Sequence, residues 1–465
     1  MADIETTFRQ IAAKTPALAL TTAAERIHKL KRLMKAVIDA KDAIADVSHR
    51  ELRTSYLGAL GQIIMLKGEV DYVCAHLEEW MKPAPAEPSP SFMGRKAYVK
   101  YEPKGMFLNL ATWNAPVLIS LHPAVGAIAA GNGVIIKPSE LAPYSAALVQ
   151  DIVASVFPRD EVAVVNGGPE VAQQLLALPF NHIFYTGGMR VGRLVMKAAA
   201  DHFASVTLEM GGKNPTIVDA SANLEDAMPK IVQGRVINAG QVCIAPDYAL
   251  VHASRYDEFV RSFGPVATAM FNGDGKGFQA NEHMPRIVNK HHFDRVRGLL
   301  DDAVAKGATV AFGGELDAND LYVSPTLLTN VTEDMKVMQE EIFAPLLPVI
   351  PWRERQEAID IINRRPKPLA SYVFGTDREV VDWFLDRTTS GSCAVNNSVT
   401  QAGHPTLPFG GANQSGLGRT GGHASFLESS NARGVVEDAL DPTSVPAFRP
   451  TPDELRHMME YMLTV

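Results

Sequence analysis

Short apolar runs that alternate with segments of helical spacing limit most strongly what this chain can fold into. Each run is five or six residues long and carries at most one charged side chain. Strands of this kind are buried on both faces, as in a parallel sheet that helices cover on both sides. The runs are MFLNLA (106–111), GVIIK (133–137), VAVVN (162–166), HIFYT (182–186), VTLEM (206–210) and PTIVD (215–219). The sequence therefore predicts an α/β fold whose parallel sheet binds ligands beyond the carboxyl ends of its strands.

The segments around these runs predict additional parts. Residues 22–49 and 55–81 place apolar side chains at helical spacing and predict two long amphipathic helices. The proline-rich segment KPAPAEPSP (82–90) predicts an extended connector, because proline fixes φ and has no amide N–H. It leads into KAYVKYEP (96–103), where alternation predicts an exposed strand, and a second α/β stretch is expected from about 222 to 395.

Charge and cysteine content narrow the function. The chain has 465 residues and a net charge of −8 with both signs mixed, which argues against a partner such as nucleic acid or an anionic membrane. Its three cysteines lie far apart and form no Cys/His cluster, so we expect no metal site, no disulfide framework and a reducing, cytoplasmic location. The first residues do not resemble a signal peptide. The nearly uncharged stretch 115–136 contains two prolines, which favours a buried helix leading into a buried strand over a membrane span.

Two residues within this pattern are candidates for chemistry. Cys243 stands in NAGQVCIAPDY between apolar neighbours, and a cysteine in that setting is most often a core residue. The turn-like residues before it and Pro246 after it favour instead a position that faces a cleft, whereas Cys74 and Cys393 fit packing positions. Glu209, inside the run VTLEM, is either one half of a buried ion pair or a general base whose pKa is raised by burial.

Polar residues also follow three of the predicted strands. Asn114 comes after the run 106–111, and its amide is either an oxyanion donor or a turn former. Lys137 and Glu140 follow the next strand, where they either hold a ribose or form a solvated strand end. Residues 186–188 open a strand-to-helix turn that is either an ordinary turn or a place for a phosphate.

In order and spacing, these pieces resemble the aldehyde dehydrogenase superfamily. The resemblance runs from about residue 5 to residue 435 and includes the offset of 34 residues from Glu209 to Cys243. The motifs that carry it are TWNAP (112–116), GAIAAGNGVIIKPSE (126–140), YTGGMRVG (185–192), LEMGGKNP (208–215), GQVCIAPDY (240–248), EEIFAP (340–345) and LPFGGANQSGLGR (407–419). Within the superfamily, GQVCIAPDY and LPFGG resemble the branch that holds class 3, fatty aldehyde and bacterial coniferyl aldehyde dehydrogenases.

The resemblance implies an NAD(P)-dependent oxidation of an aldehyde to the carboxylic acid, through a cysteine thiohemiacetal and a thioester. In that chemistry Cys243 is the nucleophile, Glu209 the general base and Asn114 the oxyanion donor. The implied cofactor-binding positions are Trp113, Lys137, Glu140, Thr186, Gly187, Gly188, Val191, Glu341 and Phe343, and the implied substrate-side positions are Ala115 and Phe409. The implied cofactor is NAD, with NADP as the alternative, because the carboxylate of Glu140 would repel a 2′-phosphate.

Departures from the family pattern bear on the substrate. Gly188 replaces a common serine, Ala344 replaces the usual glycine, and Ala115 stands where relatives often have an aromatic residue. If Ala115 lines the substrate tunnel, its mouth is wider, so we expect an aromatic or a medium- to long-chain aliphatic aldehyde. Two alternatives stay open. One is a CoA-acylating relative, a group that typically lacks the carboxylate found here at Glu209, and the other is a non-catalytic member, which would usually lack the cysteine or the base.

By resemblance the chain divides into three parts and a tail. The expected parts are an NAD(P)-binding domain (1–81 and 104–211), a catalytic domain (212–412), a bridging β element (82–103 and 413–440) and a C-terminal tail (441–465). The exposed strand edges of the bridging element would pair with a second subunit, so the expected assembly is a homodimer. The tail is too short and polar for the membrane anchor of fatty aldehyde relatives.

Overall fold

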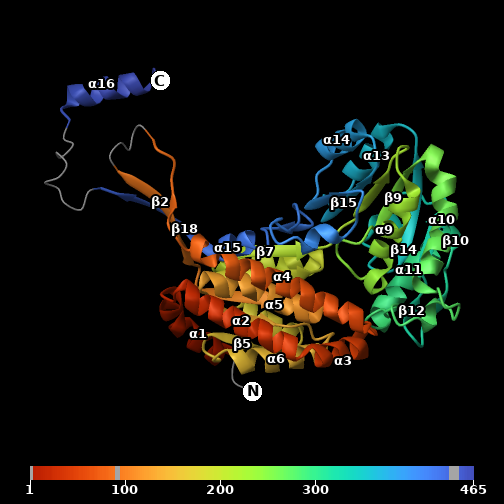
Figure 1. The fold of residues 1–465 in the computed structure, drawn as a ribbon, viewed down its shortest axis with the longest axis horizontal. Helices are drawn as coiled ribbons and strands as arrows, with labels where there is room; N and C mark the ends of the chain where they lie inside the picture. Colours follow the sequence, from red (N-terminus) through yellow and green to blue (C-terminus); the bar gives the residue numbers. More distant parts are fainter. Residues whose placement is uncertain (1–3, 90–94, 439–449, 465) are drawn as a thin grey trace.

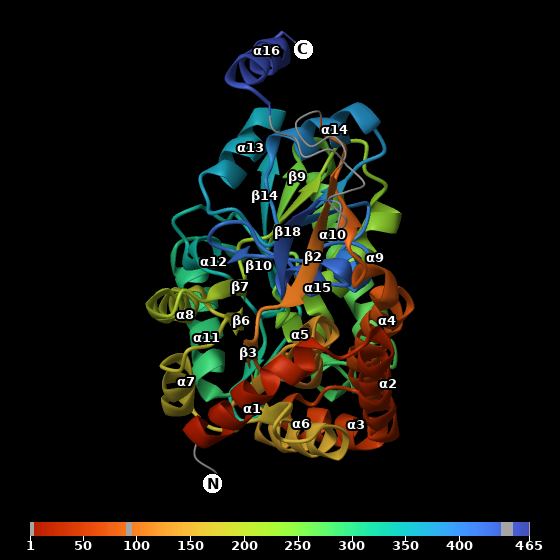
Figure 2. The same ribbon diagram turned by 90° about the vertical axis from the view of Figure 1, so that its left-hand side faces the viewer.

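The structure is a computed structural model that describes residues 4–89, 95–438 and 450–464. Two α/β lobes lie side by side, and a narrow β arm projects from the first lobe (Figure 1). The arm consists of β1 (Ala84–Pro85), β2 (Lys96–Pro103) and β18 (Ser430–Glu437). Figure 2 shows β2 and β18 beside each other along the arm, where they pair antiparallel. The predicted strand at 96–103 is therefore confirmed.

Six strands form the sheet of the first lobe. They are β3 (Met106–Leu110), β4 (Gly133–Lys137), β5 (Val162–Val164), β6 (His182–Gly187), β7 (Ser205–Met210) and β17 (Gly416–Leu417). Their order is β17-β7-β6-β3-β4-β5, and all pairs are parallel except β17 with β7. This confirms a parallel sheet for five of the six predicted runs, whereas the run 215–219 forms β8 (Pro215–Val218) in the sheet of the second lobe. The direction of strand addition reverses between β3 and β6, which is where an α/β sheet binds its ligand.

Helices cover both faces of this sheet. They are α1 (Ile4–Ala19), α2 (Ala23–Asp39), α3 (Lys41–Leu52), α4 (Tyr56–Trp80), α5 (Pro116–Ala130), α6 (Pro143–Val156), α7 (Pro169–Leu176), α8 (Met189–Asp201) and α15 (His423–Glu428). The prediction of one helix over 22–49 is wrong, because Ala40 ends α2 and precedes α3 with φ −88° and ψ 8°. Apolar spacing hides this break, since Val37 and Ile44 on either side of it are both fully buried.

The second lobe has a seven-stranded sheet. Its strands, in spatial order, are β10 (Thr309–Phe312), β13 (Thr326–Thr329), β14 (Leu346–Trp352), β9 (Tyr248–His252), β8 (Pro215–Val218), β15 (Ala370–Phe374) and β16 (Ser392–Val395). Its helices are α9 (Leu224–Val236), α10 (Ala253–Phe271), α11 (Lys290–Ala305), α12 (Lys336–Gln339), α13 (Arg355–Asn363) and α14 (Arg378–Arg387). Short elements connect them: η2 (Ile237–Gly240), η3 (Phe278–Ala280), η4 (Thr400–Gly403), β11 (Leu316–Asp317) and β12 (Tyr322–Val323). The predicted second α/β stretch is thus confirmed.

The apolar stretch 115–136 is a buried helix followed by a buried strand, as predicted. Twelve residues of α5 are buried, and every residue of β4 is. Among the described residues, no helix is long and apolar enough to cross a membrane.

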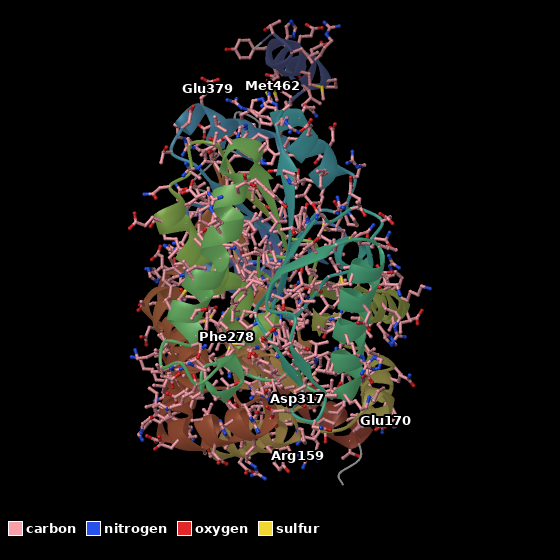
Figure 3. All side chains as sticks on the ribbon, turned by 90° about the vertical axis from the view of Figure 1, so that its right-hand side faces the viewer. Arg159, Glu170, Phe278, Asp317, Glu379 and Met462 are labelled. Atoms are coloured by element: carbon pink, nitrogen blue, oxygen red, sulfur yellow. The ribbon has the colours of Figure 1, made fainter. Side chains whose placement is uncertain are left out.

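The C-terminal segment of the predicted bridging element, residues 413–440, does not all lie in the arm. Only β18 pairs with β2, whereas β17 adds to the edge of the first-lobe sheet beside β7. The sequence hid this because a two-residue strand has no periodicity to detect. Within the predicted tail, α16 (Pro452–Met462) has no buried residue, and Met462 lies at the opposite end of the molecule from Arg159 (Figure 3). Residues 441–449 and 465 of that tail lie outside the described residues.

Candidate active site

The carboxyl ends of β3, β4, β6 and β7 bring several predicted site residues to one edge of the first-lobe sheet. Leu110, just before Asn114, pairs with both Lys137 and Tyr185. Thr186 in turn pairs with Glu209. Residues separated by about a hundred positions in the sequence therefore meet at the end of the sheet where α/β proteins bind ligands.

Cys243 lies on a loop between η2 and β9 that its neighbours hold firmly. Its carbonyl oxygen accepts a hydrogen bond from Asn214 Nδ2 (2.8 Å), and the next carbonyl, of Ile244, accepts one from the hydroxyl of Tyr372. Burial, together with the negative charges of Glu341 and Glu209, raises the pKa of the Cys243 thiol to about 12. The thiol of Cys243 is therefore protonated at neutral pH. A base must remove this proton before the sulfur can attack a substrate.

Asn114 lies against this loop. Its Nδ2 donates to the carbonyl oxygen of Gln241 (3.0 Å), and its own carbonyl accepts from Asn238 Nδ2 (2.8 Å). The side-chain oxygen of Asn114 is buried and has no hydrogen-bond partner among the described residues. Since an amide nitrogen carries two hydrogens, one N–H of Asn114 is left to donate to a ligand near Cys243.

Glu209 is a carboxylate with no hydrogen-bond partner among the described residues. Its side chain is 5% exposed, and neither oxygen accepts a hydrogen bond. Burial raises its pKa well above the ordinary value of 4.5, the charge of Arg419 opposes this shift, and Glu428 adds to it. The ion-pair interpretation therefore finds no partner here, while a buried carboxyl of raised pKa suits a general base.

Glu341 and Phe343 lie on the loop that precedes β14. Burial and the charge of Asp247 raise the pKa of Glu341 to about 8. A Cβ on Gly211 would lie 2.1 Å from both carboxylate oxygens of Glu341, so that carboxylate lies over the glycine and would have to move for a larger residue at position 211. Phe343 has a left-handed backbone (φ 50°) and packs edge-on against Trp113 at 5.5 Å.

Lys137 and Glu140 form a pair at the end of β4. Lys137 Nζ donates to Glu140 Oε2 (2.7 Å) and to the Pro138 carbonyl (3.1 Å). Lys137 is 5% exposed, whereas the Glu140 side chain is 40% exposed. The pair thus presents a carboxylate beside a buried ammonium, a donor and acceptor set that suits two ribose hydroxyls.

The turn at residues 186–188 leads into α8. Gly188 is the N-cap of α8 and provides no side-chain hydrogen bond, while its carbonyl accepts from the Tyr185 hydroxyl (2.9 Å). A Cβ on Gly188 would meet nothing within 4 Å, and Val191 on the first turn is 37% exposed. The open start of α8 fits the diphosphate of a dinucleotide, because helix amides and the helix dipole favour an anion there.

The two predicted substrate-side residues lie on different segments. Ala115 is the N-cap of α5, directly after Asn114. Phe409 exchanges two backbone hydrogen bonds with Thr420 (2.7 Å each) and packs against the same apolar cluster as Cys243.

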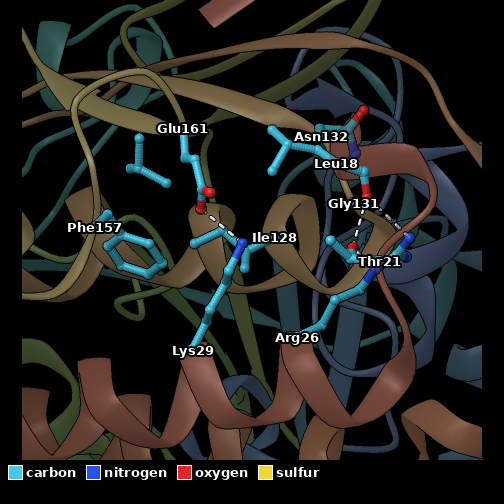
Figure 4. Close-up of a pocket in the computed structure, with 10 residues that line it drawn as sticks. Leu18, Thr21, Arg26, Lys29, Ile128, Gly131, Asn132, Phe157 and Glu161 are labelled. Atoms are coloured by element: carbon cyan, nitrogen blue, oxygen red, sulfur yellow. Dashed lines mark hydrogen bonds and ion pairs between the residues drawn. The ribbon is translucent and has the colours of Figure 1, made fainter. Parts of the chain in front are cut away.

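The small cavity drawn in Figure 4 is a separate feature. It has a volume of about 10 Å³, roughly that of one water. Lys29 and Glu161 form an ion pair of 2.6 Å across it, and Arg26 Nε donates to Thr21 Oγ1 (2.9 Å). None of its ten lining residues is a predicted site residue, so we assign it no part in catalysis. Among the described residues there is also no group of three His, Cys, Asp or Glu side chains that could hold a metal.

A family comparison decides what kind of site this is. The model described as "Aldehyde dehydrogenase family" matches residues 1–435. The chain belongs to the aldehyde dehydrogenase family. The reaction class predicted from the motifs is therefore confirmed, namely the NAD(P)-dependent oxidation of an aldehyde to the carboxylic acid.

Individual relatives of this aldehyde dehydrogenase confirm the predicted branch. A probable coniferyl aldehyde dehydrogenase of Pseudomonas aeruginosa is 38% identical over 436 residues, which are 93% of this chain and 90% of that protein. The aldehyde dehydrogenase family 3 member A2 of Rattus norvegicus is also 38% identical, over 92% of this chain and 87% of its own. A substrate-bound structure of Staphylococcus aureus AldH superposes with a TM-score of 0.93 at 34% identity and covers 99% of this chain and 100% of that one.

Several residues that hold this aldehyde dehydrogenase site together escaped the sequence analysis. Asp247 pairs with Lys213 and with Arg235 (3.2 Å), and all three side chains are buried. Arg235 also donates to the carbonyl of Gly240 (2.9 Å), and Asp247 accepts from the amide of Ile342 (3.1 Å). This buried network joins the Cys243 loop to the Glu341 loop. In the sequence this network is visible only as charged residues within apolar segments. That pattern does not indicate which residues pair with one another.

Proposed function

We propose that this aldehyde dehydrogenase oxidises an aromatic or medium- to long-chain aliphatic aldehyde, with Cys243 as nucleophile, Glu209 as general base and Asn114 as oxyanion donor. The observation that carries these roles is the buried carboxylate of Glu209, which has no hydrogen-bond partner within residues 4–89, 95–438 and 450–464 and lies close enough to Cys243 to raise the pKa of its thiol.

The first half of the reaction makes a thioester. Glu209 takes the proton of Cys243, directly or through a water, because its raised pKa makes it a stronger base than an ordinary carboxylate. The thiolate adds to the aldehyde carbon, and the free N–H of Asn114 and the amide of Cys243 stabilise the resulting oxyanion. NAD(P), when bound, supplies the acceptor for the hydride that leaves this carbon.

The second half releases the acid. Glu209 removes a proton from water, the hydroxide adds to the thioester carbon, and the C–S bond breaks to give the carboxylate and regenerate the Cys243 thiol. Both halves need Glu209 in its charged carboxylate form, so it passes the proton of Cys243 to solvent before it accepts one from water. A carboxyl whose pKa lies nearer neutrality can both accept and release a proton near neutral pH.

The proposed cofactor-binding residues divide between the two halves of the dinucleotide. Lys137 and Glu140 would hold the adenosine ribose, with Thr186, Gly187, Gly188 and Val191 at the diphosphate. At the other end, Trp113, Glu341 and Phe343 would hold the nicotinamide half. We infer a preference for NAD over NADP, because the exposed carboxylate of Glu140 would repel a 2′-phosphate.

The substrate class rests on Ala115 and on a relative. Ala115, which is half-buried, stands directly after Asn114 and places only a methyl group beside the proposed oxyanion donor. The relative named for coniferyl aldehyde, an aromatic substrate, is 38% identical. Both observations support an aldehyde larger than acetaldehyde.

The deciding experiment measures NAD(P)H formation with acetaldehyde, decanal, benzaldehyde and coniferaldehyde. We expect turnover of one of the larger aldehydes to exceed that of acetaldehyde. We also expect Cys243→Ala to abolish turnover, whereas Cys393→Ala, at another free cysteine, keeps it. A Cys243→Ala protein that still oxidises the aldehyde, or a clear preference for acetaldehyde, would contradict the proposal.

The same assay separates the alternatives. A CoA-acylating enzyme would release product only when coenzyme A is added, but the intact Glu209 argues for water as acceptor. Cofactor binding without turnover of any aldehyde would favour a non-catalytic member.

We further infer a cytoplasmic homodimer. β18 is an edge strand of the arm, and its open side can pair with a second subunit. Light scattering that reports a mass of one chain would contradict the dimer.

The cytoplasmic location rests on the cysteines. The three cysteines are all free, which suits a reducing compartment.

A further inference from the structure

We propose that Gln241 is a positioning residue that aims the free N–H of Asn114 at the place where the oxyanion forms. The inference rests on the proposed role of Asn114. Gln241 is completely buried, and its carbonyl oxygen accepts one of the two N–H groups of Asn114 at 3.0 Å. The direction of the second N–H is therefore set by where the Gln241 carbonyl lies. Because Gln241 is two residues before Cys243, one short segment carries both the nucleophile and the group that orients the oxyanion donor.

The side chain of Gln241 keeps that carbonyl in place. Nε2 donates to the carbonyl oxygens of Asn238 (3.0 Å) and Arg286 (2.9 Å), and Oε1 accepts from the amide of Val288 (3.0 Å). Both donors and the acceptor are thus engaged by backbone groups of two different segments. Two of these bonds tie the Cys243 loop to residues 286–288 and restrain the position of Gln241.

The backbone before Gln241 needs such a fastening. Asn238 and Ala239 have φ values of 52° and 53°, and Gly240 follows with φ 73°. Two successive non-glycine residues in the left-handed region are disfavoured by contacts of their Cβ atoms, so their conformation persists only where surrounding bonds hold it. Asn238 Nδ2 donates to the Asn114 carbonyl (2.8 Å) and to the Gln241 carbonyl (3.2 Å). Asn114, Asn238 and Gln241 therefore form one closed set of hydrogen bonds.

Asn132 provides a matched comparison within the same chain. It is also buried, its Nδ2 donates to the carbonyls of Ala127 (3.0 Å) and Ser429 (2.9 Å), and its Oδ1 accepts from the amide of Gly105 (2.8 Å). Its side chain makes the same three kinds of bond as that of Gln241, with no contact to Asn114 or the Cys243 loop among its hydrogen bonds. If Gln241 served stability alone, the two amides would respond alike to the same change.

The test replaces each amide by the corresponding acid, which removes donors and preserves shape. We expect Gln241→Glu to lower kcat about tenfold or more, as weakening an oxyanion donor does, with the aldehyde KM and the NAD dissociation constant within about twofold. Asn132→Asp should lower the melting temperature comparably but change kcat by less than about twofold. In an Asn114→Ala background, Gln241→Glu should cost less than about twofold in kcat, because the donor it orients is gone.

Two outcomes would overturn the proposal. One is a Gln241→Glu loss that is undiminished in the Asn114→Ala background, and the other is an equal loss of kcat in Asn132→Asp. If Gln241→Glu does not fold, Gln241→Met is compared in the same two backgrounds with the same expectations. The wild-type enzyme and Cys243→Ala test the proposed function separately, since an inactive wild type or an active Cys243→Ala would disprove that function whatever Gln241 does.

Discussion

The regions around Cys243 and around Lys137 differ in whether their buried polar groups have hydrogen-bond partners. At Lys137 the buried ammonium is paired with Glu140 at 2.7 Å and with a backbone carbonyl. Near Cys243, both oxygens of Glu209 and the side-chain oxygen of Asn114 are buried and have no partner in the part of the chain that the structure describes. Leaving such groups unpaired costs free energy, so unpartnered polar atoms that gather beside the proposed nucleophile suit groups that a reacting molecule engages.

A buried network behind the site shows that burial of charge alone does not mark chemistry. Lys213, Arg235 and Asp247 are as buried as Glu209, but each is paired within the network. Their hydrogen bonds reach the backbone of the Cys243 and Glu341 loops. Their part is to hold those loops in place.

The largest expected effect comes from removing the unpaired carboxylate. Glu209→Gln should lower kcat by about 10²- to 10⁴-fold, the usual contribution of a general base, because glutamine cannot accept the proton of Cys243 or water. Pre-steady-state NAD(P)H formation and steady-state turnover measure the loss in each half of the reaction. Glu69→Gln is the control, since Glu69 is equally buried but accepts hydrogen bonds from the amide of Gly422 (2.8 and 2.9 Å). If both variants lost kcat to a similar extent, the distinction between paired and unpaired buried carboxylates would be wrong.

The same variant has a pH signature in stability. Because the folded-state pKa of Glu209 is raised above 4.5, its contribution to stability is fully present below pH 4.5 and is lost as the pH rises through the raised pKa. The melting temperature of Glu209→Gln should therefore rise relative to that of the wild type as the pH increases above 4.5. A constant difference across this range would show that Glu209 titrates normally.

The next effect concerns the oxyanion donor. Asn114→Ala should lower kcat by about 10²- to 10³-fold, as removal of one oxyanion-hole donor does, with a much smaller change in the aldehyde KM. The reason is that the free N–H of Asn114 gains strength only when negative charge develops on the substrate oxygen. Steady-state kinetics on the best aldehyde provide the measurement. A loss confined to KM would place Asn114 in ground-state binding.

The sequence predicted the strands and the individual polar residues better than the bonds between them. The run 133–137 coincides with β4, and the run 106–111 exceeds β3 by one residue. Such runs record burial, which is a local property. The bond from Asn114 to Gln241 joins residues 127 positions apart, and the left-handed conformation of Ala239 has no signal in alanine itself. The motifs therefore named candidates for the site, while the support behind them became visible only in the folded chain.

A smaller effect is expected at the paired end. Glu140→Gln should tighten NADP binding about five- to tenfold, since two unit charges about 4 Å apart in water repel by about 1 kcal/mol. NAD binding should change less, because an amide still accepts a hydrogen bond from a ribose hydroxyl. Equilibrium titration of both cofactors, followed by protein fluorescence, measures the ratio. An unchanged ratio would mean that Glu140 lies away from the 2′ position.

The smallest effect tests the turn that begins α8. Gly188 has φ −76° and ψ 147°, which any residue adopts, and a Cβ there meets nothing within 4 Å. The Gly188→Ser variant should therefore keep the same fold. Its free energy of unfolding should rise by a few tenths of a kcal/mol, about the difference between serine and glycine at an N-cap. If a diphosphate lies at this helix start, the new hydroxyl can also donate to it, and the NAD dissociation constant should fall a few-fold, by the roughly 1 kcal/mol of one hydrogen bond. Thermal melts without and with NAD separate the two contributions. A gain in stability without any gain in NAD affinity would place the diphosphate away from position 188.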